Sequence, residues 1–394
     1  MIRAAQWVPR LLVPALLAAC ARARPPVPRP LALPFAADTL RTQQLRPGVL
    51  SRFIYAPSGP WAIHVLEIDL DRCYSALAVK GANGAIGRTK TSTLLRELAA
   101  TRDVIGGVNA DFFSLAAPLG VPVGALVSNG RVVTGPTVQP VLAFDAAGMA
   151  SITTVRSVGS AFLGAQVVDI AGWNRAAPRG LALFDAAWGL STDTATAAIE
   201  VVLTGHNPSR VAAIDTTTAG VLIPTDGAVL VAGRNAPENV RAGLLALKVG
   251  DTIRTTMSLA PFQPREAVGG RPLLLRDSVV SSAVDTSGQA SFIARNPRTA
   301  AGVARNGKRL ILAVVDGRQA PYSDGMSLRE LANLMRALGA RDALNLDGGG
   351  STTLVYTDPD SPGALRVANR PSDKEGERAV GDALAIVRGC GGRQ

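Results

Sequence analysis

A strand–helix–strand pattern between residues 310 and 356 constrains the fold more than any other part of the chain. Residues 310–315 are a short apolar run rich in β-branched residues, which is typical of a buried strand. Ser327 and Glu330 have the spacing of a capping box, and apolar residues then recur at helical spacing. A second apolar run follows at residues 343–346. This order predicts a right-handed βαβ unit with two parallel strands.

Each of the two predicted strands ends at an aspartate, Asp316 and Asp347. Parallel strands place their carboxyl ends at one edge of a sheet, so we expect the two carboxylates at neighbouring strand ends, where ligands bind. Three glycines follow at residues 348–350. Ordering three glycines costs conformational entropy, so such a run indicates a place where another group must approach the main chain closely. The alternative for Asp316 is a purely structural role, because aspartate commonly caps a turn.

The glycine triplet predicts a hollow lined by main-chain N–H groups and by the hydroxyls of Ser351 and Thr352. It is not a Walker A loop, because no lysine follows the glycines at the required spacing. Two acids beside such a hollow suit a substrate that carries both a sugar and a phosphate.

Four linked motifs carry a family resemblance. They are NPRTAAGV at 296–303, VDGR at 315–318, GMSLRELA at 325–332 and NLDGGGST at 345–352. Together they closely resemble the phosphodiester glycosidase family. The resemblance extends more weakly to NADFF at 109–113, AVGGRPLLL at 267–275 and ERAV at 377–380.

This resemblance implies hydrolysis of a sugar-1-phosphodiester at its glycosidic C–O bond. Such a site needs a carboxylate for the anomeric carbon and positive charge for the phosphate. Asp347 and Asp316 are the catalytic candidates, with either one as base or nucleophile. Arg298 and Arg378 are candidate phosphate clamps, with surface ion pairs as the alternative. The candidate substrate-binding residues are Asn109, Asp111, Gly269, Gly270, Arg298, Thr299, Asn345, Gly348, Gly349, Gly350, Ser351, Thr352 and Arg378.

The glycosidase scheme requires no cofactor and no metal. Two other functions remain possible. The first alternative is a metal-assisted phosphodiesterase that cuts P–O, with a divalent cation held by oxygen ligands from Asp316, Asp347 and Asn345. The second is a non-catalytic, lipid-anchored glycan-binding protein. The only histidines, His64 and His206, are far apart, which disfavours a Ser-His-Asp triad or a histidine-built zinc site.

The N-terminus predicts export. Residues 1–19 have a positive segment and a short apolar segment, as in a signal peptide, and residues 17–20 (LAAC) resemble a lipoprotein lipobox. Cys20 would then be lipidated, the alternative being an ordinary secretory signal. Residues 20–47 are expected to form a Pro- and Arg-rich tether, and residues 48–390 one domain. We therefore expect an extracytoplasmic, membrane-anchored lipoprotein in the periplasm or at the cell surface.

In that oxidising compartment the remaining cysteines, Cys73 and Cys390, are candidates for a disulfide that joins the two ends of the domain. Two unpaired buried thiols are the alternative.

Composition completes the expectations. Residues 141–260 alternate short apolar runs with turn residues, which predicts strands. The fold class we expect is α+β, with strand-rich mixed sheets, few helices and the C-terminal βαβ unit. The net charge of +11 indicates either attraction to phosphate-bearing envelope polymers or a general preference for arginine. Aromatic residues make up 4%, without basic–aromatic alternation, so we expect no nucleic-acid partner. The expected partners are a phosphorylated sugar, glycolipid or envelope glycan, and the membrane through the lipid anchor.

Overall fold

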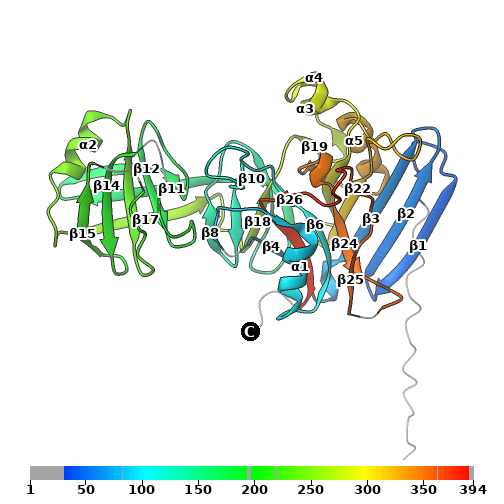
Figure 1. Ribbon diagram of the computed structural model, residues 1–394, viewed down its shortest axis with the longest axis horizontal. Coiled ribbons are helices and arrows are strands. Elements are labelled where there is room, and N and C mark those ends of the chain that lie inside the picture. The colour runs from blue at the N-terminus through cyan, green and yellow to red at the C-terminus, as the bar shows by residue number, and fades with distance from the viewer. Residues whose placement is uncertain (1–30, 82, 193–196, 218–219, 362, 390–394) are drawn as a thin grey trace, which may run out of the picture. The chain divides into compact units, whose positions relative to one another are not determined.

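A computed structural model describes residues 31–389, apart from residues 82, 193–196, 218–219 and 362. These residues belong to one compact unit that begins at Leu31 (Figure 1). The predicted signal peptide with Cys20, and also Cys390, lie outside the described residues. The fold is strand-rich α+β, as the sequence predicts.

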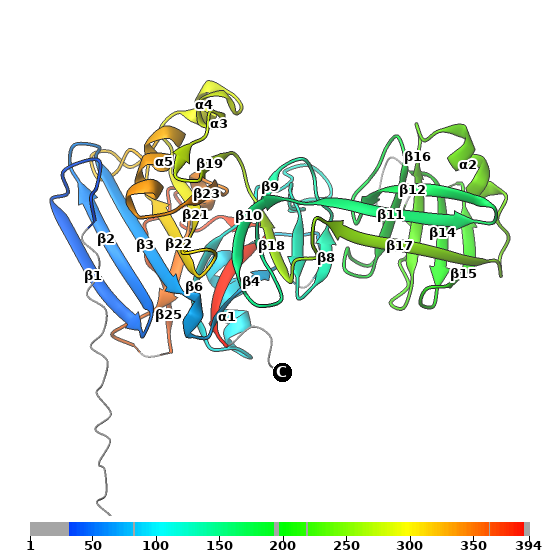
Figure 2. The same cartoon turned by 180° about the vertical axis from the view of Figure 1, so that it is seen from behind.

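The largest sheet has the strand order β1-β2-β3-β22-β21-β23-β19-β20. Helix α5 (Leu328–Ala337) covers one face of it, together with the short helices α3 (Ala283–Thr286) and α4 (Ala290–Ile293) (Figure 2). The predicted capping box of Ser327 and Glu330 is present at the start of α5. The strands are β1 (Thr39–Arg46), β2 (Val49–Ala56), β3 (Trp61–Asp69), β19 (Leu273–Arg276), β20 (Val279–Val280), β21 (Arg298–Ala304), β22 (Arg309–Val315) and β23 (Asp342–Asn345).

The predicted βαβ unit is β22–α5–β23, but its two strands are not neighbours. Strand β21 lies between them and pairs antiparallel with both. β22 and β23 are therefore parallel and end at the same edge, one strand apart. The sequence signals the two strands and the helix, but the hairpin partner that fills the gap comes from residues before them.

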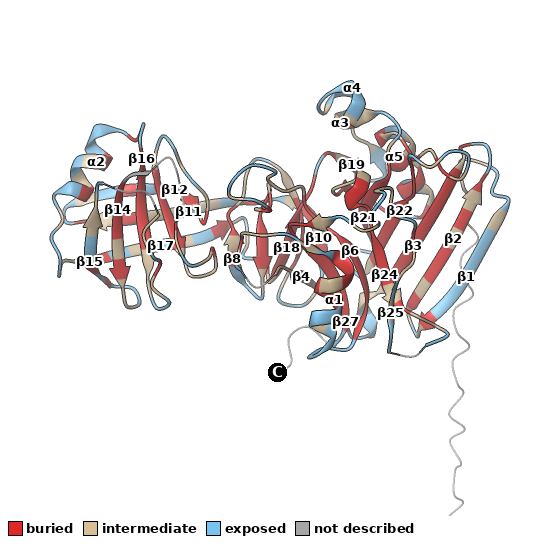
Figure 3. Cartoon of the chain, viewed as in Figure 1, coloured by how far each residue is buried: buried red, intermediate tan, exposed pale blue. Residues whose placement is uncertain are grey.

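Two five-stranded sheets pack on the other side of the eight-stranded sheet, and the main hydrophobic core lies between them (Figure 3). Leu66 and Leu312 from the large sheet meet Ile105 and Ile386 from one small sheet and Phe144 from the other. The first small sheet is β25 (Leu365–Val367), β24 (Leu354–Thr357), β6 (Val104–Asn109), β27 (Ala383–Arg388) and β4 (Tyr74–Val79), in that order. The second is β10 (Ala150–Thr154), β9 (Pro140–Phe144), β18 (Glu266–Gly269), β7 (Leu126–Ser128) and β8 (Arg131–Thr134).

Helix α1 (Thr91–Ala99) packs on the outer face of the first small sheet through Leu94 and Leu95. A two-stranded ribbon of β5 (Thr89–Lys90) and β26 (Ala379–Val380) precedes α1 and β27. Short 3₁₀ helices occur at η1 (Leu70–Arg72) and η2 (Gly349–Ser351).

The predicted strand-rich region forms a closed barrel with a hydrophobic core of its own, which also receives α2 (Glu238–Leu245). Its strands, in order around the barrel, are β11 (Arg156–Leu163), β12 (Gln166–Trp173), β13 (Leu181–Asp185), β16 (Ala228–Gly233), β14 (Ala197–Thr204), β15 (Ser209–Asp215) and β17 (Thr252–Ala260).

The expected boundary between tether and domain at residue 48 is wrong. Strand β1 pairs with β2 from Thr39 to Arg46, so the folded domain includes residues that we assigned to the tether. β1 is an edge strand whose side chains are mostly exposed, and no apolar run marks it. Main-chain hydrogen bonding, which sequence pattern does not report, holds it in place.

Cys73 is disulfide-bonded. The chain has three cysteines, so the partner is a cysteine outside the described residues. The N–H of Gly389 donates to the Cys73 carbonyl at 2.8 Å, so residue 389 lies next to Cys73. Pairing with Cys390 stays a prediction.

No helix within the described ranges has the length and apolar character needed to cross a membrane.

Candidate active site around the glycine turn

Asp347 follows β23 and is held by the end of β6. Its N–H donates to the Ala110 carbonyl at 2.9 Å. Its own carbonyl accepts from Asn109 Nδ2 at 2.7 Å. Asn109 Oδ1 in turn accepts from the Thr299 hydroxyl at 2.8 Å. Asn109 and Thr299 are fully buried, and these bonds occupy them, so they position Asp347 instead of contacting a ligand as we predicted.

The Asp347 carboxylate is poised for proton transfer. One of its oxygens accepts from the Gly348 N–H at 2.9 Å. Burial raises the pKa of Asp347 to about 6, against the lowering effects of the Ser351 hydroxyl, that N–H, Arg378 and Arg271. A carboxyl group with such a pKa changes its charge close to neutral pH, as general acids and bases do.

The glycine triplet forms the tight turn η2 after Asp347. Gly349 has φ +63°, a conformation that glycine adopts without strain. A side chain at Gly350 would collide with Asp373 and with the Arg378 guanidinium. The amides are less available than we predicted, because Gly348 donates to Asp347 and Gly349 donates to the Pro297 carbonyl. Of the three, only the Gly350 N–H has no acceptor among the described residues.

Three arginines surround this turn. Arg378 binds Asp373 through Nε and Nη2 at 2.9 and 3.0 Å. Arg318 lies against Gly349 and donates to Asn296 Oδ1 at 2.8 Å. Arg271 lies over the Phe112 ring, 5.0 Å from its centroid. Arg378 lies beside Gly350, and its role as a phosphate clamp stays a prediction. We did not predict Arg271 or Arg318, although both lie inside motifs that the sequence displays.

Asp382 is a second carboxylate of this site that sequence reasoning missed. It is fully buried just before β27, and its Oδ1 accepts from the Asp111 N–H at 2.9 Å. Its Oδ2 has no hydrogen-bond partner among the described residues. Burial raises the pKa of Asp382 to about 7, Lys80 opposes the shift, and the charge of Asp347 adds to it. The signal in the sequence was Gly-Asp ahead of the last strand, which we did not weigh.

Asp316 does not act as the partner of Asp347 that we predicted. It is 1% exposed, and its carboxylate is fully engaged by hydrogen-bond donors. These donors are His64 Nε2 at 3.1 Å, the Tyr322 hydroxyl at 3.2 Å, Asn369 Nδ2 at 3.0 Å and the Arg370 N–H at 3.0 Å. The structural alternative therefore holds for Asp316. Through Asn369, which also donates to the Thr352 carbonyl at 3.1 Å, it braces the glycine turn from behind.

Arg298 is not a phosphate clamp. It is 2% exposed and begins β21 instead of lying in a turn. Its guanidinium donates to the carbonyls of Met326, Phe292 and Ala294 at 2.6–2.8 Å. Burial lowers the pKa of Arg298 to about 10. It ties the segment before β21 to the segment before α5, so its charge serves the fold.

Asp111, Gly269 and Gly270 are also committed to contacts within the protein. Asp111 accepts from the N–H groups of Phe112 and Gly124 at 2.8 and 2.5 Å, so its carboxylate is not free for a sugar. A side chain at Gly269 would collide with Asp111, and one at Gly270 would lie 2.6 Å from the Asn345 carbonyl oxygen. These two glycines allow close packing within the protein.

Some buried polar atoms near the turn have no protein partner. Within the described ranges they include Asn345 Oδ1, Thr352 Oγ1 and Thr353 Oγ1, in addition to Asp382 Oδ2. Buried groups of this kind normally find a partner, so they indicate positions where water or a ligand completes the hydrogen bonding. No group of three or more His, Cys, Asp or Glu side chains in the described part of the chain is arranged to hold a metal ion.

One comparison with known proteins matches a family over part of the chain. Residues 198–387 match the family model of the phosphodiester glycosidases, a range that contains Asp347, Asp382 and the three arginines. None of the curated proteins compared matches the chain.

Solved structures share the fold. A hypothetical protein from Synechocystis is 24% identical, with a TM-score of 0.72 over 89% of this chain and 64% of that chain. This chain thus spans less than two thirds of that protein. A protein of Burkholderia pseudomallei K96243, described only as exported, is 26% identical, with a TM-score of 0.65 over 84% and 74% of the two chains. The catalytic domain of zebrafish N-acetylglucosamine-1-phosphodiester α-N-acetylglucosaminidase, auto-inhibited by its pro-peptide, is 17% identical, with a TM-score of 0.45 over 89% and 83%.

The four motifs, the glycine turn that they build and the match over residues 198–387 agree, and the predicted resemblance is confirmed. Over residues 198–387 the chain is similar to the phosphodiester glycosidase family.

Proposed function

We propose that the chain hydrolyses the glycosidic C–O bond of a sugar-1-phosphodiester. One observation carries this proposal: a carboxyl group with a pKa near 6, Asp347, lies at the head of a glycine turn that three arginines surround. This arrangement suits a substrate with an electrophilic carbon, on which the carboxylate acts, and an anionic leaving group, which the arginines bind.

The leaving group explains the arginines. A phosphomonoester has a second pKa near ~6, so it departs with little need of protonation. Arg318, Arg378 and the Gly350 N–H neutralise the charge that develops on it. Each such donor is expected to contribute about 2.7–4 kcal/mol of transition-state stabilisation.

The carboxylates serve the sugar. Asp347, when ionised, acts at the anomeric carbon as nucleophile or as base for a water molecule. Asp382 takes the place of second carboxyl group that we first gave to Asp316, and its raised pKa keeps it protonated, and so without negative charge, below about 7. In the nucleophile scheme, C–O cleavage forms a glycosyl ester on Asp347, which water then hydrolyses. In the base scheme, water attacks directly and Asp347 receives its proton.

The first test is Asp347→Asn, which keeps the size and the Gly348 contact but removes the charge. We expect loss of turnover on a chromogenic sugar-1-phosphodiester with an unchanged melting temperature, whereas Asp226→Asn, in an exposed loop of the barrel, keeps full activity. A purified Asp347→Asn protein that retains near-wild-type kcat/KM excludes the proposal.

Hydrolysis in ¹⁸O-labelled water distinguishes the proposed glycosidase from the metal-assisted phosphodiesterase. Label in the sugar supports C–O cleavage, and label in the phosphate supports P–O cleavage. Activity that disappears on chelation and returns with a divalent cation favours the second reaction. Turnover of any sugar-1-phosphodiester excludes the purely glycan-binding alternative.

We also propose that the enzyme works outside the cytoplasm on an envelope glycan or glycolipid, held to a membrane by a lipid on Cys20. The disulfide at Cys73 supports an oxidising compartment, and the similar Burkholderia protein is described as exported. Metabolic labelling of the expressed protein with a fatty acid, in the wild type and in Cys20→Ser, tests the anchor.

A further inference from the structure

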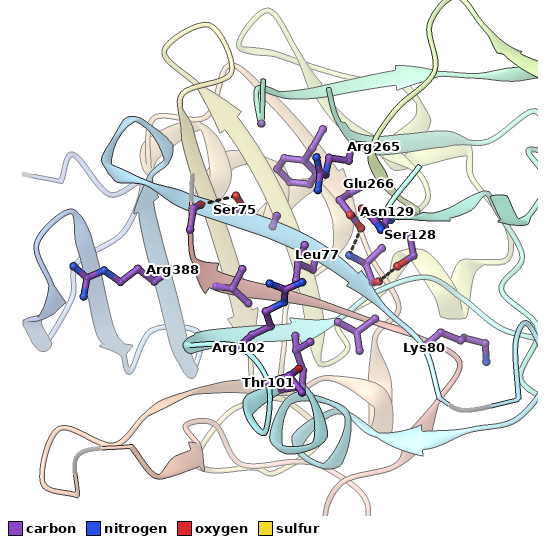
Figure 4. Close-up of a pocket in the computed structure, with 18 of the residues that line it drawn as sticks. Ser75, Leu77, Lys80, Thr101, Arg102, Ser128, Asn129, Arg265, Glu266 and Arg388 are labelled. Carbon is purple, nitrogen blue, oxygen red and sulfur yellow. Dashed lines mark hydrogen bonds between the residues drawn. The ribbon is translucent and has the colours of Figure 1, made fainter. Parts of the chain in front are cut away.

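A hollow of about 740 Å³ follows strand β4 at the edge of the first small sheet (Figure 4), and no residue of the glycine turn lines it. It is lined along the whole strand, from Ser75 to Lys80. Arg388 lies at one end of the hollow and Lys80 at the other (Figure 4). Six strand residues span roughly 20 Å, so the hollow is a groove for an extended ligand and not a pocket for a single ion.

The arginines of this groove are free of salt bridges within the described part of the chain. Arg102, Arg265 and Arg388 line it, and none of the three forms a salt bridge with another described residue. Arg102 and Arg388 are exposed, and Arg265 is half-buried. Arg305, Arg329 and Arg341 differ, because each of these exposed arginines is paired with an aspartate.

The two acids of the groove are already satisfied. Glu266 is 2% exposed, and its oxygens accept from the N–H groups of Ala78 and Asn129, both at 2.9 Å. Burial raises the pKa of Glu266 to about 7. Asp145 accepts from the N–H groups of Ala147 and Met149, both at 2.9 Å. Lys80 is held by the Gly87 carbonyl at 2.9 Å. Three arginines therefore face two carboxylates that main-chain N–H groups already cap, and the groove favours an anion.

The free edge of β4 is closed to a peptide strand. The Ala78 N–H is taken by Glu266, and the Ala78 carbonyl accepts from the Ser128 hydroxyl at 2.8 Å. A strand added to this edge would lose both bonds, so strand addition is disfavoured.

The rest of the lining suits sugars. Hydroxyl and amide side chains of Ser75, Thr101 and Asn129 alternate with the half-buried apolar side chains of Leu77 and Leu98. Polar groups of this kind bind sugar hydroxyls, and the apolar patches accept the faces of sugar rings.

We propose that this groove binds a chain of an anionic glycan, which carries phosphate, sulfate or carboxylate groups along its length. The arginines pair with the anionic groups, and the polar and apolar lining binds the sugars between them. Binding in the groove does not require hydrolysis at Asp347, so the two are tested apart.

The test measures binding of a fluorescent, size-defined dextran sulfate to the full chain at two salt concentrations. The groove variant combines Arg102→Gln, Arg265→Gln and Arg388→Gln. Its matched control combines Arg156→Gln, Arg179→Gln and Arg234→Gln, which removes the same charge from exposed positions in the barrel. We expect the Kd to rise about tenfold or more in the groove variant and to change less than about twofold in the control. Added salt should weaken wild-type binding more than binding of the groove variant.

Three further ligands separate the sources of the charge. Neutral dextran and inorganic phosphate should bind at least about tenfold more weakly than dextran sulfate. Tight binding of neutral dextran overturns the role of charge, and equal affinity for phosphate overturns the role of a chain. If the groove variant loses binding to vesicles of anionic phospholipid but keeps binding to dextran sulfate, the surface serves a membrane and the proposal is wrong. Equal losses in the groove and control variants also contradict it.

Two measurements distinguish groove binding from the proposed hydrolysis, because each tests one activity in the variant designed to remove the other. Asp347→Asn should keep wild-type affinity for dextran sulfate, and the groove variant should keep wild-type turnover of a small sugar-1-phosphodiester. A failure of groove binding with intact turnover sinks this inference alone, and the reverse result sinks the proposed function alone.

Discussion

Asp347 and Asp382 share one electrostatic environment, and their charges are linked. Burial raises both pKa values, to about 6 and about 7, and each negative charge disfavours the other. Two carboxyl groups that interact in this way titrate as a pair. If Asp347 acts ionised and Asp382 acts protonated, the active form is most populated between the two values.

We therefore expect a bell-shaped dependence of kcat/KM on pH. The rate should fall below about 6, as Asp347 takes up a proton, and above about 7, as Asp382 loses its proton. In Asp382→Asn the alkaline limb should disappear while the acid limb remains. Initial rates on a soluble sugar-1-phosphodiester across this range measure both limbs, and an alkaline limb that survives in Asp382→Asn argues against the role of Asp382.

Arg298 and Arg378 are the same type of residue with different roles: Arg298 stabilises the fold, and Arg378 lies at the candidate active site. Arg298→Met removes three hydrogen bonds and leaves the Phe292 carbonyl without this donor, while Asn296 still donates to the Met326 and Ala294 carbonyls. We therefore expect a loss of about 1–3 kcal/mol in the free energy of unfolding, with a KM close to wild type. Arg378 is 40% exposed at the glycine turn. Arg378→Gln should lower kcat/KM by about 10²-fold and leave stability within about 0.5 kcal/mol. Urea unfolding and steady-state kinetics on both variants check this, and an exchange of the two phenotypes would contradict it.

At the scale of elements, β1 shows how an edge strand contributes. It covers the edge of β2 with a full antiparallel ladder although its outer side chains are exposed. Without it, β2 becomes an exposed edge strand, which is prone to pair with other chains.

A chain that starts at Gly48 should accordingly be less stable than one that starts at Leu31, and it should aggregate more readily. The two proteins differ only in residues 31–47, so urea midpoints and light scattering compare them directly. Equal midpoints and equal solubility would restore the view that this segment is a tether.

At the scale of the whole molecule, the site is assembled from segments far apart in the chain. The Asn109 amide at the end of β6 fixes Asp347 after β23, and Asp382 enters at the start of β27. Sheets from the N-terminal and C-terminal parts of the domain therefore hold the site jointly, and their relative position sets its geometry.

The disulfide of Cys73 acts at this scale. We expect Cys73→Ser and Cys390→Ser each to lower the free energy of unfolding by about 2–4 kcal/mol, because the bond restricts the unfolded chain. Cys20→Ser should have no such effect. Peptide mapping without reduction identifies the pair directly, and a Cys20–Cys73 peptide would refute the predicted pairing.

The sequence by itself determined the local elements. A buried strand ends at Val315, the Ser327–Glu330 box starts α5, and Asp347 precedes a glycine turn. Each of these depends on neighbouring residues only, through side-chain periodicity, capping and backbone conformation, and so each is visible in sequence.

Only the tertiary structure decided which strands pair and which groups surround the charged side chains. It placed β21 between β22 and β23, enclosed Asp316 within four donors, buried Arg298 among carbonyls and brought Asp382 to the electrostatic field of Asp347. The physical reason is that periodicity reports which face of a strand is buried but not which strand lies beside it. The state of a charged group depends on its burial and on its neighbours in space, and those neighbours come from distant parts of the chain.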